Sequence, residues 1–142
     1  MDEMLLAYTD RFRTAFELTH RKLGQTVFAK LESDLTMPQF FMLYMIRKEG
    51  APKQSQLADK MGVKPSAITV MIDRLVQSGH VIRKHHETDR RIVLVELTEL
   101  GEEVLKKAEK VHKEVTASGM SQLSLEEMRI MVEAFEKLAA YY

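Results

Sequence analysis

Apolar side chains recur at helical spacing over the first part of the chain, from about Met4 to Leu31, and no proline interrupts them. Residues three or four positions apart share one face of an α-helix, so the pattern predicts one long helix with an apolar stripe. The stripe consists of Leu5, Tyr8, Phe12, Phe16, Leu23, Val27 and Leu31.

A second helix is expected from Thr36 to about Lys48. Thr36 and Gln39 have the spacing of a capping box, in which each side chain satisfies a backbone N–H group of the other residue. Gly50 is expected to end this helix. Because apolar residues cover much of its surface, we expect it to be buried; they are Phe40, Phe41, Leu43, Tyr44 and Ile46.

Two shorter helices follow in the pattern. The first spans residues 54–61 and is expected to end at Gly62, where a left-handed residue is needed. The second spans residues 65–78, begins at Pro65 and stops at Gly79. Its buried face is expected to carry Ile68, Ile72, Leu75 and Val76.

The periodicity then changes to that of β-strands. Residues 81–84 and 92–97 are rich in β-branched side chains, and the polar, charged segment 85–91 separates them. This order predicts a β-hairpin with a long exposed tip. Two more helices complete the chain: one from a Thr98 cap to a stop at Gly119, and one from a Ser124 cap to the C-terminus. The fold class is therefore mainly α with a small β-hairpin.

A helix, a glycine turn, a second helix and a hairpin are the parts of a winged helix-turn-helix. In that fold the second helix enters the major groove of DNA, which is wide enough for it. The exposed face of helix 65–78 would offer small hydroxyl-bearing and apolar side chains and one arginine to base edges. The alternative is an amphipathic helix whose polar face is only solvated. The residues concerned are Ser66, Ala67, Thr69, Val70, Asp73 and Arg74.

The hairpin tip favours DNA binding, because an arginine at the end of a wing can enter the minor groove. Arg90 and Arg91 are the candidate contacts. Asp89 would oppose DNA binding by its charge, but it can orient one guanidinium through a bidentate ion pair. The alternative is a solvated surface pair of little energetic weight.

Overall charge and composition narrow the possible functions. The chain has 21 basic and 21 acidic residues, but residues 53–98 contain eight basic and five acidic ones, a local excess of three positive charges. Cysteine is absent, which removes disulfides, thiolate zinc sites and thiol-based sensing. The five histidines do not converge, so no metal or other cofactor is expected. No membrane span or secretory signal is recognisable, and we expect a cytoplasmic protein.

Four motifs, in order and with the same spacing, resemble the MarR family of winged helix-turn-helix regulators: residues 57–63 (LADKMGV), 68–75 (ITVMIDRL) with 79–83 (GHVIR), 89–91 (DRR) and 97–101 (LTELG). The resemblance covers nearly the whole chain, so residues 1–142 are expected to form one MarR-like domain. Within it, residues 36–98 would be the DNA-binding winged helix, and residues 1–32 and 99–142 the dimerisation helices.

The resemblance implies a homodimer on a pseudo-palindromic operator in double-stranded DNA. It places four side chains of helix 65–78 in the major groove, Arg91 in the minor groove held by Asp89, and Arg90 near the DNA backbone. The chain departs from the family pattern at Lys64, where a Ser, Thr or Asp cap is usual, and at Val70, where many relatives carry a polar or basic residue. The four groove-facing side chains are Ser66, Thr69, Val70 and Arg74.

The apolar residues of the first and the last two helices are more than a DNA-reading unit needs, which favours a two-fold interface over a monomer core. In the MarR family, small aromatic or phenolic effectors bind near this region. The residues expected near such a pocket are Phe16, His20, Phe40 and Tyr44, with core packing as the alternative for each.

The sequence bears on three function classes. The first is a sequence-specific transcriptional regulator, most simply a repressor that occludes a promoter. The alternative is a winged-helix protein-interaction module without sequence-specific DNA binding; the basic wing speaks against it. An enzyme is not expected, because the chain has no P-loop, nucleophile elbow or paired-carboxylate motif.

Overall fold

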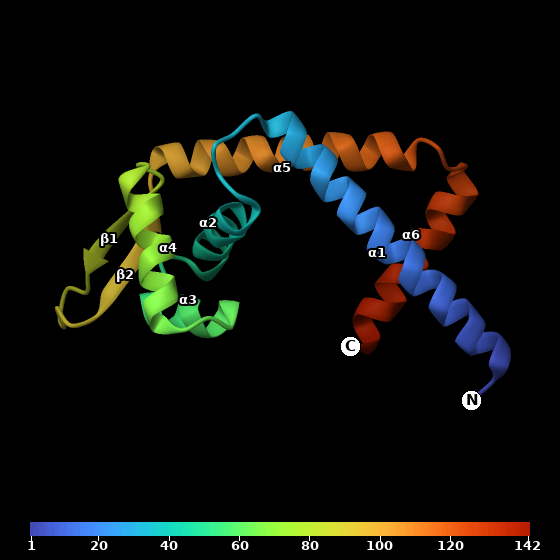
Figure 1. The fold of residues 1–142 in the computed structure, drawn as a ribbon, viewed down its shortest axis with the longest axis horizontal. Helices are drawn as coiled ribbons and strands as arrows, with labels where there is room; N and C mark the ends of the chain where they lie inside the picture. Colours follow the sequence, from blue (N-terminus) through green and yellow to red (C-terminus); the bar gives the residue numbers. More distant parts are fainter. The chain divides into compact units, whose positions relative to one another are not determined.

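The structure is a computed structural model that describes all residues, 1–142, in eight elements. They group into two compact units: Glu32–Glu109, called here the winged-helix unit, and Met1–Leu31 with Lys110–Tyr142, called the helical unit. In chain order they are α1 (Glu3–Leu31), α2 (Met37–Glu49), α3 (Gln54–Met61), α4 (Pro65–Gln77), β1 (Val81–His85), β2 (Val93–Leu97), α5 (Glu99–Met120) and α6 (Leu125–Tyr141) (Figure 1).

Helix α2 begins as its sequence predicts. The Thr36 hydroxyl accepts from the Gln39 N–H at 3.3 Å, and the Gln39 side chain accepts from the Thr36 N–H at 2.7 Å. Two otherwise unpaired backbone donors are thereby satisfied. The helix ends at Gly50, which is left-handed with φ 65°. The predicted capping box and glycine stop are confirmed.

The turn between α3 and α4 depends on Gly62. This residue has φ 64°, a conformation that a side chain would strain, and its N–H donates to the Asp59 carbonyl at 3.2 Å. The Val63 N–H donates to the Ala58 carbonyl at 3.1 Å, which completes a Schellman-type end for α3. Lys64 then precedes α4 and provides no side-chain cap. Helix α4 therefore begins without the side-chain cap that the family pattern usually provides at this position.

The hairpin is antiparallel, with Val81 opposite Leu97 and His85 opposite Val93. Its first strand is one residue longer than predicted, and its second begins at Val93 and not at Ile92, whose N–H donates to the Asp89 carbonyl within the tip. The segment before α3 pairs briefly with β2: Lys53 forms a β-bridge with Leu94, and the Val95 N–H donates to the Pro52 carbonyl at 3.0 Å.

The core of the winged-helix unit joins its helices to its sheet. Every element of the unit from α2 to β2 contributes a side chain that is at most 1% exposed, so the inner face of α4 packs against a closely packed apolar core. These residues are Met42, Leu43, Ile46, Leu57, Ile68, Ile72, Leu75, Val81 and Val95. Val76, predicted on the same face of α4, is only partly buried.

The start of α5 is fixed against the root of the wing. The Thr98 hydroxyl accepts from the Gly101 N–H at 3.1 Å and donates to the Gly79 carbonyl at 2.6 Å. The Thr98 N–H donates to the His80 carbonyl at 3.0 Å. A Cβ on Gly101 would lie 2.2 Å from that same carbonyl oxygen, so the packing requires glycine.

The predicted stop of α5 at Gly119 is wrong, because the helix continues through Gly119 to Met120. Gly119 is not among the glycines with positive φ. A glycine within a helix costs only about 1 kcal/mol relative to alanine, so it does not end a helix without a left-handed turn. The chain turns two residues later, where the Gln122 N–H donates to the Gly119 carbonyl at 3.1 Å.

Three aromatic rings connect α1 to α6 in the helical unit, where the two helices cross (Figure 1). Phe135 lies 5.9 Å from Phe12 and 6.0 Å from Phe16, measured between ring centroids. A second capping box starts α6, because Ser124 and Glu127 exchange hydrogen bonds of 2.8 and 3.2 Å. These bonds lower the pKa of the Glu127 carboxyl. No helix of the chain combines the length and the apolar character that a membrane crossing needs.

Candidate nucleic-acid interface

Helix α4 presents an exposed face opposite its buried one. Ser66, Thr69, Val70 and Arg74 are all exposed, whereas Ile68 on the far side is buried. The first turn of α4 keeps free backbone donors, because the leading N–H groups of a helix have no partner within it and no side chain caps them here. Such a turn favours a negatively charged group such as a DNA phosphate.

A hydrogen-bonded network, absent from the sequence-based expectations, holds one edge of this face. The Gln54 amide nitrogen donates to the Thr69 hydroxyl at 3.0 Å, and that hydroxyl donates to the Pro65 carbonyl at 3.0 Å. The Gln54 amide oxygen accepts from Arg83 Nε at 3.1 Å. Arg83 Nη2 lies 2.6 Å from Asp73 Oδ1. The network therefore joins the start of α3, one side of α4 and strand β1.

This network changes what Thr69 can do. A hydroxyl has one proton, and the Thr69 proton is used by the Pro65 carbonyl, so this side chain cannot also donate to a base edge. Asp73 is likewise engaged by Arg83. The i,i+4 spacing of Thr69 and Asp73, which places both on one side of the helix, is the only sequence signal for the network.

At the wing tip, Asp89 holds the guanidinium of Arg91 in a two-point ion pair. Arg91 Nε donates to Asp89 Oδ1 and Nη2 donates to Oδ2, each at 3.0 Å, and the Arg91 backbone N–H also donates to Oδ1 at 3.0 Å. These bonds lower the pKa of the Asp89 carboxyl and raise the pKa of Arg91. The Arg91 side chain is 91% exposed, so the pair fixes a cation that projects into solvent.

Hydrogen bonds within the tip keep the adjacent residues in a defined turn. His85 Nδ1 lies 2.9 Å from the Arg90 carbonyl oxygen, and the His86 N–H donates to the Ile92 carbonyl at 3.0 Å. The Thr88 N–H donates to His86 Nδ1 at 3.3 Å. Arg90 is exposed and has no carboxylate partner, so it is free to contact an anion.

An open hollow of about 370 Å³ lies between the start of α3 and the wing. Two cations, Lys53 and Arg91, are among its lining residues, and Ser55 adds a hydroxyl. Its remaining lining residues are Gln54, Ile92 and Val93. The hollow therefore places the network residue Gln54 and the wing arginine along one surface.

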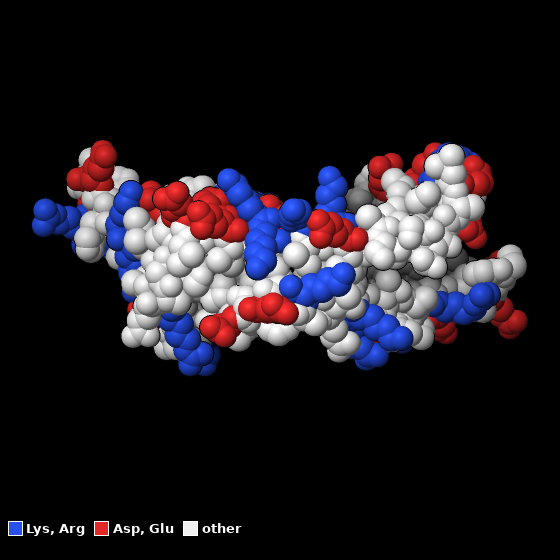
Figure 2. All heavy atoms as spheres, turned by 90° about the horizontal axis from the view of Figure 1, so that it is seen from above, with Lys and Arg blue, Asp and Glu red and all other residues white.

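Charge on the winged-helix unit is mixed, as Figure 2 shows for the surface it displays. Among residues 53–98, four cations lie within 4 Å of a carboxylate: Lys60 with Glu49, Arg83 with Asp73, Lys84 with Glu96, and Arg91 with Asp89. The cations without such a partner between residues 53 and 98 are Lys53, Lys64, Arg74 and Arg90. The local positive excess thus comes from residues at the start of α3, on α4 and at the wing tip.

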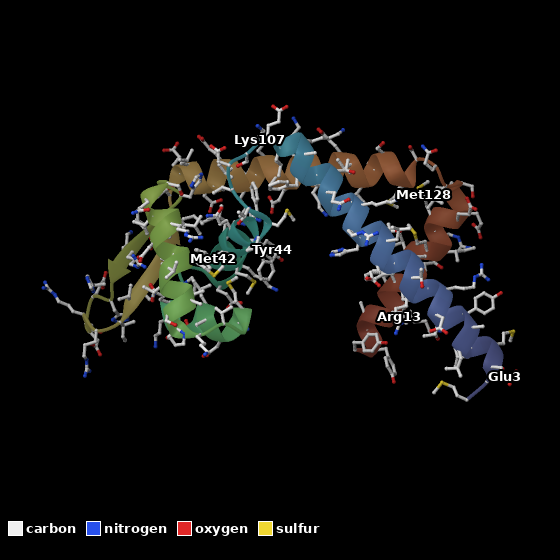
Figure 3. The ribbon with its side chains drawn as sticks, in the orientation of Figure 1. Glu3, Arg13, Met42, Tyr44, Lys107 and Met128 are labelled. Atoms are coloured by element: carbon white, nitrogen blue, oxygen red, sulfur yellow. The ribbon has the colours of Figure 1, made fainter.

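The four residues expected near an effector pocket are divided between the units. Phe16 and His20 belong to the helical unit, where their rings stack with centroids 6.1 Å apart. Phe40 and Tyr44 belong to α2 of the winged-helix unit: Phe40 is 7% exposed and packs in the core, whereas Tyr44 is 41% exposed. Tyr44 and the fully buried Met42 leave α2 on different faces (Figure 3). An effector role for the four residues stays a prediction.

Known proteins of the same fold are similar to this chain in sequence. A model of the MarR family matches residues 35–93, which hold α2 to α4, strand β1 and the wing tip. The HTH-type transcriptional repressor MdtR of Bacillus subtilis is 34% identical over an alignment that covers 81% of this chain and 80% of that protein.

Solved structures agree along nearly the full length. The YusO protein from Bacillus subtilis is 29% identical with a TM-score of 0.78, and all of both chains is covered. A mutant MarR from E. coli complexed with operator DNA is 25% identical with a TM-score of 0.68, covering 90% of this chain and 93% of that one. This chain therefore belongs to the MarR family, and it is a winged-helix transcriptional regulator and not an enzyme.

Proposed function

We propose that this protein is a cytoplasmic repressor that binds a pseudo-palindromic operator as a homodimer and is released from it by a small aromatic or phenolic ligand. Helix α4 enters the major groove and the wing tip enters the adjacent minor groove. The observation that carries the proposal is the two-point ion pair of Asp89 with Arg91, which fixes an exposed guanidinium at the wing tip.

Direct contacts to bases and to phosphates are assigned to different side chains. Ser66, Val70 and Arg74 face the base edges, and Thr69 supports them at the edge of the same surface. Arg91 enters the minor groove, where the negative potential over narrow A·T tracts attracts guanidinium groups. Arg90 contacts the DNA backbone beside it.

The helical unit supports a dimer. No residue of α6 is buried in the single chain, and large apolar side chains of α1 and α6 stay exposed. A second copy would cover these side chains and pair two reading units about a two-fold axis, as a palindromic site requires. The exposed side chains include Leu5, Phe12, Phe16, Ile130, Val132, Phe135 and Leu138.

Repression is supported by the name of a relative, and release by a ligand is supported by an aromatic pair. The relative MdtR is named a repressor, and occlusion of a promoter needs nothing beyond tight operator binding. Phe16 and His20 form a stacked aromatic pair that suits a flat phenolic molecule. We therefore expect compounds of this class to lower operator affinity.

The test is DNA binding by the purified full-length protein. Fluorescence anisotropy with its own upstream region, excess unrelated competitor and a salt series should show binding by two protomers per site. Affinity should fall steeply between about 50 and 200 mM salt, because phosphate contacts release counterions. If neither this region nor any sequence from a random-sequence selection is bound, the regulator binds no specific DNA and the winged helix serves a protein partner.

Two variants sharpen the test. Arg91→Ala should weaken operator binding while the melting temperature and the dimer mass stay unchanged. Lys137→Ala removes an equal charge from an exposed position on α6 and should leave binding unchanged. Equal effects of the two variants would contradict a minor-groove role for Arg91. A panel of phenolic and benzoic compounds that changes neither affinity nor melting temperature would contradict the effector role.

A further inference from the structure

We propose that Val70 recognises the 5-methyl group of a thymine in the major groove, so that each half-site of the operator contains one required thymine. The inference rests on the proposed insertion of α4 into the major groove and deepens it. The thymine methyl would be the chemical group that the centre of the exposed face of α4 recognises.

Val70 lies on the side of α4 opposite its buried residues. A helix turns about 100° per residue, which places Val70 about 160° around the axis from both Ile68 and Ile72. Both of these residues are buried, at 1% and 0% exposure, whereas Val70 is 51% exposed. Val70 therefore occupies the middle of the exposed face, where a helix in a groove approaches the base edges.

The side chain of Val70 is entirely apolar. Its side chain can neither donate nor accept a hydrogen bond, so it gains nothing from the polar edges of guanine, cytosine or adenine. The thymine methyl is the apolar group that a base pair displays in the major groove. Burying one methyl against a second apolar surface stabilises a complex by an amount that corresponds to about fourfold in affinity.

The neighbours of Val70 leave this central position without a competing polar group. Thr69 uses its hydroxyl proton on the Pro65 carbonyl, and Asp73 is engaged by Arg83. Ser66 and Arg74 lie one turn before and one turn after Val70, where they can contact adjacent base pairs or phosphates. An apolar centre with polar groups on both sides suits a methyl contact at one defined base pair.

The experiment uses deoxyuridine, which pairs as thymine does but lacks the methyl group. A random-sequence selection with the full-length protein first supplies a bound duplex. Each thymine is then replaced singly by deoxyuridine, and affinity is measured by anisotropy. We expect one thymine per half-site at which the replacement weakens binding about fourfold. In Val70→Ala the same replacement should have an effect below twofold, because the contacting methyl groups are gone.

The controls separate this inference from general damage. Alanine favours a helix more than valine does, so Val70→Ala should keep α4 folded and leave the melting temperature unchanged. Ser66→Ala, on the same face, should retain the fourfold thymine preference. Arg90→Ala should weaken binding to the thymine and deoxyuridine duplexes equally, because a phosphate contact does not depend on the base.

Each failure has a separate meaning. If no duplex is selected, the proposed function fails, and the thymine contact fails with it. If a duplex is bound but no thymine is sensitive to methyl loss, operator binding stands and the role of Val70 is overturned. A sensitive thymine that stays fully sensitive in Val70→Ala also overturns it, because another residue then recognises the methyl.

Discussion

Arg83 in strand β1 reaches across to Asp73 in helix α4, and its Nη2 lies 2.6 Å from the Asp73 carboxylate. The same guanidinium donates to Gln54 at the start of α3. A single side chain of the wing therefore contacts both helices of the helix-turn-helix. The contact fixes the orientation of α4 relative to the wing. The proposed binding mode requires this, because α4 would contact the major groove while the wing tip contacts the adjacent minor groove.

Arg83→Met should weaken operator binding much more than it weakens the fold. Both charges of the pair are partly exposed, and such pairs contribute about 0.2–1 kcal/mol to the free energy of unfolding. We expect DNA affinity to fall at least tenfold, because Gln54 and Asp73 lose their common partner and α4 is no longer held to the wing. Urea denaturation and anisotropy measure the two effects.

Lys84→Met is the matched control. Lys84 is the next residue of β1 and forms an exposed ion pair with Glu96 at 2.7 Å, but it touches neither α3 nor α4 through that pair. Its removal deletes one charge and one ion pair of the wing, as Arg83→Met does. An equal loss of DNA affinity in both variants would show that charge, and not the position of α4, is responsible.

Burial of His80 predicts a pH dependence of stability. Burial lowers the pKa of His80 below its ordinary value of 6.5. The unfolded chain therefore takes up a proton at this residue at a higher pH than the folded chain does, and the free energy of unfolding falls as pH drops below about 6.5. Urea denaturation of His80→Gln should show a smaller difference between pH 7.5 and pH 5.5 than the natural chain. His112→Gln, at a position on α5 without such burial, should keep the full difference.

Contacts between neighbouring residues were the part of the site that the sequence could predict. The Asp89–Arg91 pair spans two residues, so the backbone alone brings the groups together, and the capping boxes at Thr36 and Ser124 have the same local origin. The glycine turn at Gly62 follows from a conformation that other residues avoid.

The network around Arg83 could not be predicted in this way. Gln54 and Arg83 are 29 residues apart in the chain and meet only because Leu57, Ile68 and Val95 pack into one core. Apolar periodicity predicts which face of each element is buried, but it does not predict which polar side chains then meet at the rim. The same limit explains Gly119, whose residue type suggested a helix end although no left-handed turn forms there.

Gly101 and Gly119 should respond in opposite ways to the same substitution. A Cβ at Gly101 would lie 2.2 Å from the His80 carbonyl oxygen, and this backbone atom cannot move without breaking its bond to the Thr98 N–H. Gly101→Ala should therefore lower the free energy of unfolding by about 1–3 kcal/mol. At Gly119 a Cβ meets nothing within 4 Å, and Gly119→Ala should raise the free energy by up to about 1 kcal/mol. Urea denaturation of both variants tests the pair; destabilisation by Gly119→Ala would contradict a helical Gly119.

Asp89→Asn should weaken operator binding although it makes the protein more positive. Asparagine cannot form the two-point ion pair, so the Arg91 guanidinium would lose its fixed direction and would have to be ordered when DNA binds. A simple electrostatic effect would have the opposite sign, because removing a negative charge beside DNA raises affinity. Anisotropy at one salt concentration decides between the two.

Glu87→Gln removes the same charge from the same loop, at an exposed carboxylate with no ion-pair partner. It should leave operator affinity unchanged or raise it, since no arginine depends on Glu87 for its orientation. A gain in affinity in both variants would mean that Asp89 acts on DNA only through its charge. A loss confined to Asp89→Asn would show that the direction of Arg91 matters more for binding than the net charge of the wing.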